Sequence, residues 1–229
     1  MTLNRLLLLA ILLAASTSAQ AQRFNQKSHY DDLRRGTWEA SLLASYGNTT
    51  SFAGESGSFI DVDSAVGWGF TVGYNLSSRW NVSYKFTLHK PDYLLVRVTD
   101  PEEGEDPVIR EIDHTLDRYA HALNVTWHWF DGPLTPYLQG GIGYTKLDSN
   151  IPSQPPQTGC WWDPWWGYIC DTQWRTYDTS EMTYNLGLGV RWDINGAFFV
   201  RGVYSREWFG SDNYDLDYDT LSVDFGLMW

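Results

Sequence analysis

The chain has 229 residues and a formal net charge of −12, with 28 acidic and 16 basic side chains. This charge disfavours a nucleic-acid partner, because nucleic-acid binding requires clustered Lys and Arg. The chain also holds 13 Trp, 14 Tyr and 20 Gly although its mean hydropathy is negative. This combination is unusual for a soluble core and typical of a barrel that spans a membrane, whose apolar outside and polar lumen cancel in the mean.

The N-terminal residues 1–21 have the features of a secretion signal peptide. Arg5 supplies a positive start, Leu6 to Ala15 is a short apolar core, and Ala19-Gln20-Ala21 has the form of a cleavage site. The apolar core is too short to cross a bilayer as a helix, and no later stretch reaches about 18 apolar residues. We therefore expect export, followed by a short periplasmic segment (22–36) and one outer-membrane β-barrel domain (37–229).

Strands are identified by alternation, because successive side chains of a strand point to opposite faces. The predicted strands, in chain order, are 38–46, 65–76, 80–89, 119–129, 137–147, 182–193, 198–208 and 221–229. In the second, third, sixth and last of these, all 22 positions on one face are apolar. Each strand has about 9 to 12 residues, which is long enough to cross a membrane at a tilt.

The connections between these strands alternate in length. Short turns are expected at 77–79, 131–134 and 194–196, and long loops at 47–62, 90–116, 148–179 and 209–219. Short periplasmic turns and long outer loops are typical of outer-membrane barrels. An aromatic girdle is expected near the short turns, since these aromatic residues lie there: Tyr74, Trp80, Trp127, Trp129, Tyr137, Trp192, Phe198 and Trp229. A soluble lipocalin-like barrel is the alternative, but it needs an apolar lumen.

Two segments carry a resemblance to a known family. Pro136-Tyr137-Leu138-Gln139-Gly140-Gly141-Ile142-Gly143-Tyr144 and the closing strand Leu221–Trp229 resemble strands of the OmpA, OmpX and OmpW group. The resemblance implies an all-β fold: an eight-stranded antiparallel transmembrane β-barrel with short periplasmic turns and four long extracellular loops. It also implies a Gram-negative outer membrane as the location. This chain departs from OmpA because it stops at the last strand, so wall anchoring is not expected.

The same resemblance implies partners. Phe225, Leu227 and Trp229 would form the assembly signal that the barrel-assembly machinery reads. Outer-membrane lipid and lipopolysaccharide would surround a monomeric barrel, and a surface ligand would contact its loops.

Strand parity turns a set of charged residues toward the lumen. The predicted lumen network is Glu39, Lys85, Arg118, Arg191, Arg201, Glu207 and Asp224, with His128 beside it. An eight-stranded barrel has an interior barely wide enough for its own side chains, and unpaired buried charges are costly. We therefore expect a salt-bridged polar plug with a structural role. The alternative is a gated pore in which exchange of ion-pair partners opens a water path.

The two cysteines of the chain, Cys160 and Cys170, lie in the longest expected loop. Export places them in an oxidising compartment, so a disulfide is predicted. The ring that it closes contains the aromatic residues Trp161, Trp162, Trp165, Trp166 and Tyr168. We interpret these as a contact surface for carbohydrate, lipid or a protein partner. The alternative is a self-packed cap or a rim that touches lipopolysaccharide.

Other candidate chemistry is weaker. The acidic loop residues are Asp100, Glu102, Glu103, Glu105, Asp106, Asp215, Asp217 and Asp219. Carboxylates attract hard cations, but no Gly-punctuated calcium loop accompanies them, so a solvated anionic surface is expected, with no metal and no cofactor. His89 and His114 lie near the outer rim without a nucleophile motif, so no catalytic residue is assigned.

The favoured function is therefore an envelope-structural or surface-interaction role of the extracellular loops. A narrow channel for small or hydrophobic solutes is the alternative, as an OmpW-like resemblance implies. A lipid A-modifying enzyme is the third hypothesis.

Overall fold

The computed structural model describes residues 33–53, 58–99, 108–173, 175–210 and 217–229. The expected signal peptide and most of the segment 22–36 lie outside the described residues, as does the acidic stretch from Asp100 to Asp106. Among the described residues, no helix is long and apolar enough to cross a membrane.

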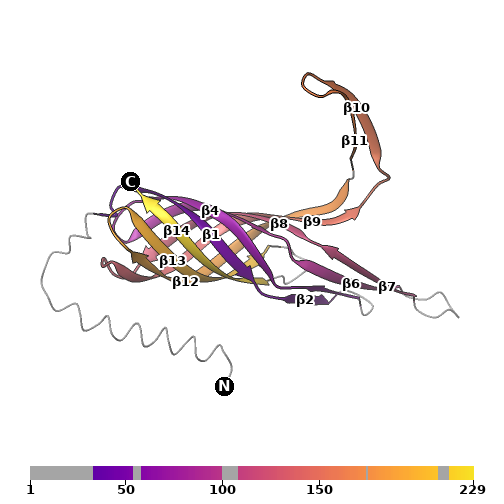
Figure 1. Cartoon of the computed structure of the whole chain (residues 1–229). Helices are drawn as coiled ribbons and strands as arrows, with labels where there is room; N and C mark the ends of the chain where they lie inside the picture. Colours follow the sequence, from indigo (N-terminus) through magenta and orange to yellow (C-terminus); the bar gives the residue numbers. More distant parts are fainter. Residues whose placement is uncertain (1–32, 54–57, 100–107, 174, 211–216) are drawn as a thin grey trace, which may run out of the picture.

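Eight antiparallel strands form a closed barrel, which confirms the predicted fold class (Figure 1). They are β1 (Trp38–Gly47), β4 (Ala65–Asn75), β5 (Trp80–His89), β8 (Asp117–His128), β9 (Leu134–Pro152), β12 (Thr176–Asp193), β13 (Phe198–Phe209) and β14 (Asp217–Met228). The order around the barrel is β1-β14-β13-β12-β9-β8-β5-β4. The first and last strands pair directly, with Glu39 opposite Met228, so the barrel leaves no open edge.

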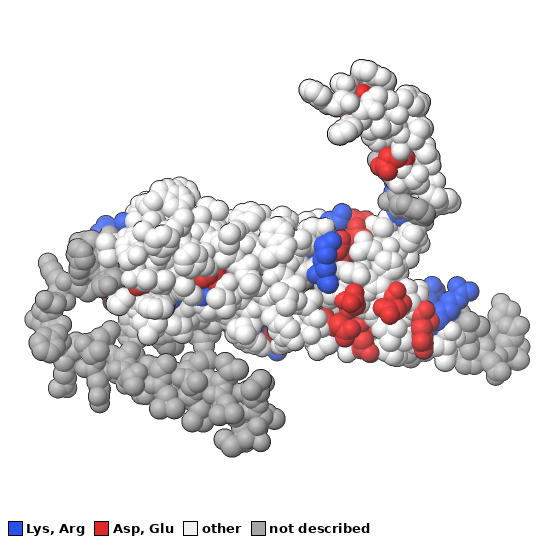
Figure 2. Space-filling view, in the orientation of Figure 1, with Lys and Arg blue, Asp and Glu red and all other residues white. Residues whose placement is uncertain are grey.

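The alternation in the sequence becomes an apolar outside and a polar inside. Along β14, Leu221, Val223, Phe225 and Leu227 stay exposed, whereas Ser222 and Asp224 between them are buried. The same pattern runs along β1, β4 and β12. Figure 2 shows the result as a largely uncharged band on the visible face of the barrel, with many charged side chains gathered at the long-loop end. An uncharged belt of this kind suits contact with lipid hydrocarbon.

The prediction that Tyr137 belongs to the aromatic girdle is wrong. Leu138 is the outward residue of this part of β9, so parity turns Tyr137 into the lumen, where it is 1% exposed. Its ring lies 5.7 Å from the ring of His128 on β8. Gly189 on β12 provides the space, because a Cβ at Gly189 would lie 2.5 Å from Cζ of Tyr137.

The expected long loops contain strands of their own. β2 (Thr50–Ala53), β3 (Phe59–Val62), β6 (Asp92–Thr99) and β7 (Val108–Thr115) form a four-stranded sheet in the order β2-β3-β6-β7. β10 (Gln157–Asp163) and β11 (Gly167–Gln173) form a separate hairpin. In Figure 1 the sheet continues the barrel lengthwise, whereas the hairpin turns away from the barrel axis. The connections predicted at 47–62, 90–116 and 148–179 are therefore long, as expected, and they contain strands that the sequence analysis did not predict.

Candidate functional site: a polar lumen and an aromatic hairpin

Glu39 is the centre of the charge network near the short turns. It is 1% exposed, and its two carboxylate oxygens accept hydrogen bonds from two arginines. Nη1 of Arg191 donates to Oε2 at 2.7 Å, and Nη1 of Arg201 donates to Oε1 at 2.8 Å. Asn75 adds a third donor, at 3.2 Å from Oε2. This carboxylate is therefore satisfied on both oxygens, as a buried charge must be.

The pairing continues on either side of Glu39. Arg201 also donates from Nη2 to Asp224 at 2.8 Å, and Arg191 donates from Nε to Asp193 at 2.7 Å. Asp193 in turn pairs with Arg34. The result is one line of alternating charges, which we call the six-group chain: Arg34, Asp193, Arg191, Glu39, Arg201 and Asp224. Three positive and three negative groups cancel, so the barrel buries them without net charge.

The ring of Phe199 packs against the guanidinium groups of Arg191 and Arg201. Its ring centroid lies 4.2 Å from Cζ of Arg191 and 5.0 Å from Cζ of Arg201, and the side chain is fully buried. Stacking on an aromatic face favours both cations. Alternation places Phe199 inward, because Phe198 is the outward residue, but it does not show that the ring of Phe199 contacts two guanidinium groups. Gly226 makes the space, because a Cβ there would lie 2.3 Å from Cζ of Phe199.

Arg34 closes the short-turn mouth of the lumen. Its Nη2 donates to the carbonyl of Gly132 at 2.6 Å, its Nη1 to the carbonyl of Ser78 at 3.4 Å, and its Nε to Asp193 at 2.5 Å. These partners belong to the three short turns or their borders. Gly36, with a φ of 75°, allows the chain to turn between Arg34 and β1. The sequence carried no signal for Arg34, because it lies in the segment expected to precede the barrel.

A second charge cluster lies toward the long-loop end. Nη2 of Arg118 donates to Oε2 of Glu207 at 2.6 Å, and Thr145 donates to Oε1 at 2.7 Å. The Arg118 guanidinium also lies 4.4 Å from the centroid of Tyr218. The lumen thus holds two polar clusters, one toward each end, and both consist of predicted network residues together with residues that parity did not single out.

His89 contacts Ser45, which raises the question of a nucleophilic serine. Nε2 of His89 lies 2.9 Å from Oγ of Ser45, and Nδ1 lies 3.3 Å from Nη1 of Arg118. A guanidinium only donates, so Nδ1 must accept and the ring proton stands on Nε2. His89 therefore donates to Ser45 and cannot take its proton, which is the reverse of nucleophile activation. His114 lies on the exposed sheet, where its Nδ1 accepts from the backbone N–H of Thr115 at 2.9 Å.

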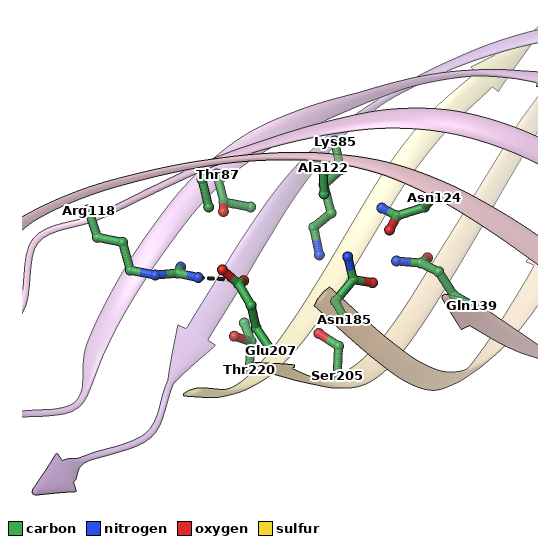
Figure 3. A pocket seen from close by; sticks show the side chains of 11 residues that line it. Lys85, Thr87, Arg118, Ala122, Asn124, Gln139, Asn185, Ser205, Glu207 and Thr220 are labelled. Carbon is green, nitrogen blue, oxygen red and sulfur yellow. Dashed lines mark hydrogen bonds and ion pairs between the residues drawn. The ribbon is translucent and has the colours of Figure 1, made fainter. Parts of the chain in front are cut away.

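Lys85 lies between the two clusters and faces a small cavity (Figure 3). The cavity has a volume of about 30 Å³. Its lining includes Asn124 and Asn185, whose Oδ1 atoms have no hydrogen-bond partner among the described residues. Lys85 donates to Oγ of Ser222 at 3.3 Å, and no carboxylate of the described chain lies within 4.0 Å of its Nζ. A polar space of this size suits water.

Exposed ion pairs surround the long-loop rim. Lys146 of β9 and Asp178 of β12 lie 2.9 Å apart, beyond the last outward apolar pair, Tyr144 and Met182. The hydrogen bond from Lys146 lowers the pKa of Asp178, and the hydrogen bond to Asp178 raises the pKa of Lys146. Two of the acidic loop residues, Asp217 and Asp219, each pair with Arg206. Asp215 lies outside the described residues.

The hairpin β10–β11 and its turn, residues 157–173, form the aromatic hairpin. Cys160 and Cys170 face each other in the ladder and form a disulfide. The five predicted contact residues are all exposed; Trp165 and Trp166 are 88% and 82% exposed. They do not pack into a cap over the lumen. In the described part of the chain, no group of three or more His, Cys, Asp or Glu could hold a metal ion.

Comparison with known families decides the class of this barrel. A model of the outer membrane protein beta-barrel domain matches residues 7–228. The chain belongs to this family. The protein is therefore an outer-membrane β-barrel. Barrels of this class have their short turns in the periplasm and their long connections outside the cell.

The chain is also similar to solved structures. OprG from Pseudomonas aeruginosa is 11% identical with a TM-score of 0.50, over 86% of this chain and 97% of that one. The N-terminal barrel domain of Pseudomonas aeruginosa OprF is 14% identical (TM-score 0.46; 85% and 98% covered). Ail of Yersinia pestis, the attachment invasion locus protein, in complex with the heparin analogue sucrose octasulfate, is also 14% identical (0.46; 84% and 99%). At these identities OprG supports the fold alone. No curated protein matches the chain.

Proposed function

We propose that this barrel has an envelope-structural and surface-interaction role that it performs through its extracellular elements. The observation that carries the proposal is the aromatic hairpin, whose four tryptophans are exposed on a stem closed by a disulfide. Exposed aromatic patches of this size are costly in water and mark contact sites. A lumen filled by two ion-paired clusters supports the same view, because it leaves the extracellular elements as the accessible part of the molecule.

Ligand binding by the purified barrel tests this proposal. The variant Trp161→Ala/Trp162→Ala/Trp165→Ala/Trp166→Ala should lose binding to lipopolysaccharide, glycans or matrix proteins that the native barrel binds. Leu94→Ala/Ile109→Ala is the matched control, because these exposed apolar residues lie on the other extracellular sheet. Equal binding by native protein and the tryptophan variant would contradict the proposal.

A narrow channel is the second candidate, and the central cavity favours it. Lys85 and Glu207 both line this cavity, while Glu207 is held by Arg118 (Figure 3). If Glu207 exchanged its partner Arg118 for Lys85, charge would shift across the lumen and a water path could widen. Planar-bilayer recording separates the candidates: a structural plug stays silent, and substitution of Glu39 or Arg201 changes conductance only if the plug is a gate.

We propose no enzymatic role. The direction of the hydrogen bond between His89 and Ser45 supports this view, because it leaves the serine without a base. Release of acyl chains from lipopolysaccharide by the native barrel, abolished by His89→Ala or His114→Ala, would overturn it.

A further inference from the structure

Aromatic side chains surround the end of the aromatic hairpin. Trp162 and Tyr168 face each other on the side of the disulfide, whereas Trp161 and Ile169 face each other on the opposite side. Trp165 and Trp166 occupy the turn between the strands and are the most exposed residues of the five. An apolar platform for a flat ligand needs only one face. Aromatic residues on both faces and at the tip instead fit a medium that surrounds the whole end.

The hairpin is polar near the barrel and apolar at its tip, which is the order expected if the tip enters a lipid layer. Behind the disulfide, the hydroxyls of Thr158 and Thr172 pair across the strands at 3.0 Å. At the tip, Oδ1 of Asp163 accepts from the backbone N–H groups of Trp165 and Trp166, at 2.8 and 3.0 Å. This carboxylate is therefore already bound within the turn. The stem is polar and the last turn is aromatic.

The absence of basic residues from the hairpin indicates which part of a membrane it would contact. Residues 157–173 contain no Lys or Arg. Anionic headgroups or sulfated sugars would be attracted by basic side chains, which are lacking here. Indole rings without cations favour the boundary between acyl chains and polar headgroups, where the ring is apolar and its N–H stays hydrogen-bonded.

The geometry points to the membrane that holds the barrel. The outward apolar belt ends at Tyr144 and Met182, and the Lys146–Asp178 pair above it is exposed. From that level, the eight residues 145–152 rise roughly 26 Å, and the seven-residue strands of the hairpin span roughly 23 Å, at about 3.3 Å per residue. The hairpin strands are therefore nearly as long as the segment that lifts them above the apolar belt. A hairpin that folds back toward the membrane could bring its tip close to the level of Tyr144 and Met182. In Figure 1 the hairpin stands off to one side of the barrel, and its tip bends back in the direction of the short-turn end instead of continuing onward with β6 and β7.

We propose that the aromatic hairpin seats its tip in the outer leaflet of the barrel's own membrane, with Trp165 and Trp166 at the acyl–headgroup boundary. The inference rests on the proposed surface role and specifies its partner as lipid. It gives the disulfide a purpose, since a closed and stiff stem holds the tip at a fixed distance from the barrel.

Fluorine NMR of the full chain tests this seat. The protein is labelled with 5-fluorotryptophan and placed in bilayer nanodiscs of phosphatidylcholine and lipopolysaccharide. Trp165→Phe and Trp166→Phe assign the two tip resonances, and Trp80→Phe assigns a girdle tryptophan as the lipid reference. Ile109→Trp supplies a water-exposed reference on β7. A nitroxide lipid and an aqueous gadolinium chelate then broaden lipid-exposed and water-exposed resonances, respectively.

We expect the lipid nitroxide to broaden both tip resonances as strongly as that of Trp80, and the gadolinium chelate to leave them sharp. If the gadolinium chelate instead broadens the tip resonances as strongly as that of the Ile109→Trp variant, and the lipid nitroxide does not, the proposed contact with lipid is wrong. In that case, tryptophan-dependent binding of a soluble glycan or matrix protein would leave the surface role standing. If the lipid nitroxide does not broaden the tip resonances and no soluble ligand binds through the tryptophans, both the lipid seat and the surface role are contradicted.

Discussion

At the residue scale, Glu39 is the side chain on which the lumen depends most. Its carboxylate neutralises Arg191 and Arg201 together, and all three are buried. Glu39→Gln keeps the shape but removes the charge. We expect it to lower the free energy of unfolding by about 3 to 5 kcal/mol, because three buried cations then face two carboxylates and the six-group chain carries one uncompensated positive charge. Urea unfolding in lipid vesicles measures the loss, and the exposed Glu111→Gln is the control. A loss no larger than that of the control would show that the lumen is hydrated enough to screen these charges.

Arg34 permits a comparison of two adjacent arginines. Arg34 is buried and binds Asp193, whereas Arg35 is exposed. Arg34→Ala should cost about 1 to 3 kcal/mol, less than Glu39→Gln, because Asp193 retains its bond to Arg191. Arg35→Ala should change the free energy of unfolding by less than about 0.5 kcal/mol. Equal effects of the two variants in the same unfolding assay would argue against the closure of the mouth by Arg34.

The Lys146–Asp178 pair should respond to pH. The lowered pKa of Asp178 means that its contribution to stability is present above the pKa of the unfolded carboxyl and is lost as pH falls through the folded pKa. Lys146→Ala should therefore raise the pKa of Asp178 toward 3.8. A carbon-detected NMR titration of the carboxyl reads this directly. Because both side chains are exposed, we expect no measurable change in global stability.

At the element scale, the aromatic hairpin should behave as a separate unit. Its strands pair only with each other in the described sheets. Removal of the disulfide by Cys160→Ser/Cys170→Ser should therefore destabilise the hairpin by about 3 kcal/mol, the entropy of closing a loop of this size. Hydrogen exchange should become faster in β10 and β11 and stay unchanged in β1 and β14. Faster exchange in the barrel strands would show that the two units are coupled.

The elements also show what the sequence could and could not predict. All eight barrel strands were predictable, because lipid requires strict alternation on the outward face of strands such as β4 and β14. The strands of the extracellular sheet were not, since neither of their faces meets lipid and their pattern is mixed, as in β6. Parity identified Glu39 and Arg201 as inward, but it could not say which cation meets which carboxylate. Parity turns Phe199 and Tyr137 inward as well, but only the glycines opposite them, Gly226 and Gly189, show that the lumen has space for their rings.

At the scale of the whole molecule, the closed hydrogen-bonded barrel should resist detergent. Direct pairing of β1 with β14 leaves no strand edge at which SDS could begin to unfold it. We expect the folded protein to migrate faster than the boiled protein on SDS gels. Glu39→Gln should lower the temperature of this shift, whereas the Cys160→Ser/Cys170→Ser variant should keep it. A single band at all temperatures, or full solubility without detergent, would contradict a membrane barrel.

The six-group chain has a consequence for the order in which the barrel is built. Arg34 and Glu39 come from the start of the described chain, but Arg191, Asp193, Arg201 and Asp224 come from β12, β13 and β14. While those strands are still being synthesised, β1 would carry an unpartnered carboxylate into lipid, at a cost of several kcal/mol. Stepwise insertion from the N-terminus is therefore unfavourable. Charge pairing therefore favours entry into the membrane only once β12, β13 and β14, which lie in about the last quarter of the chain, are present together with β1.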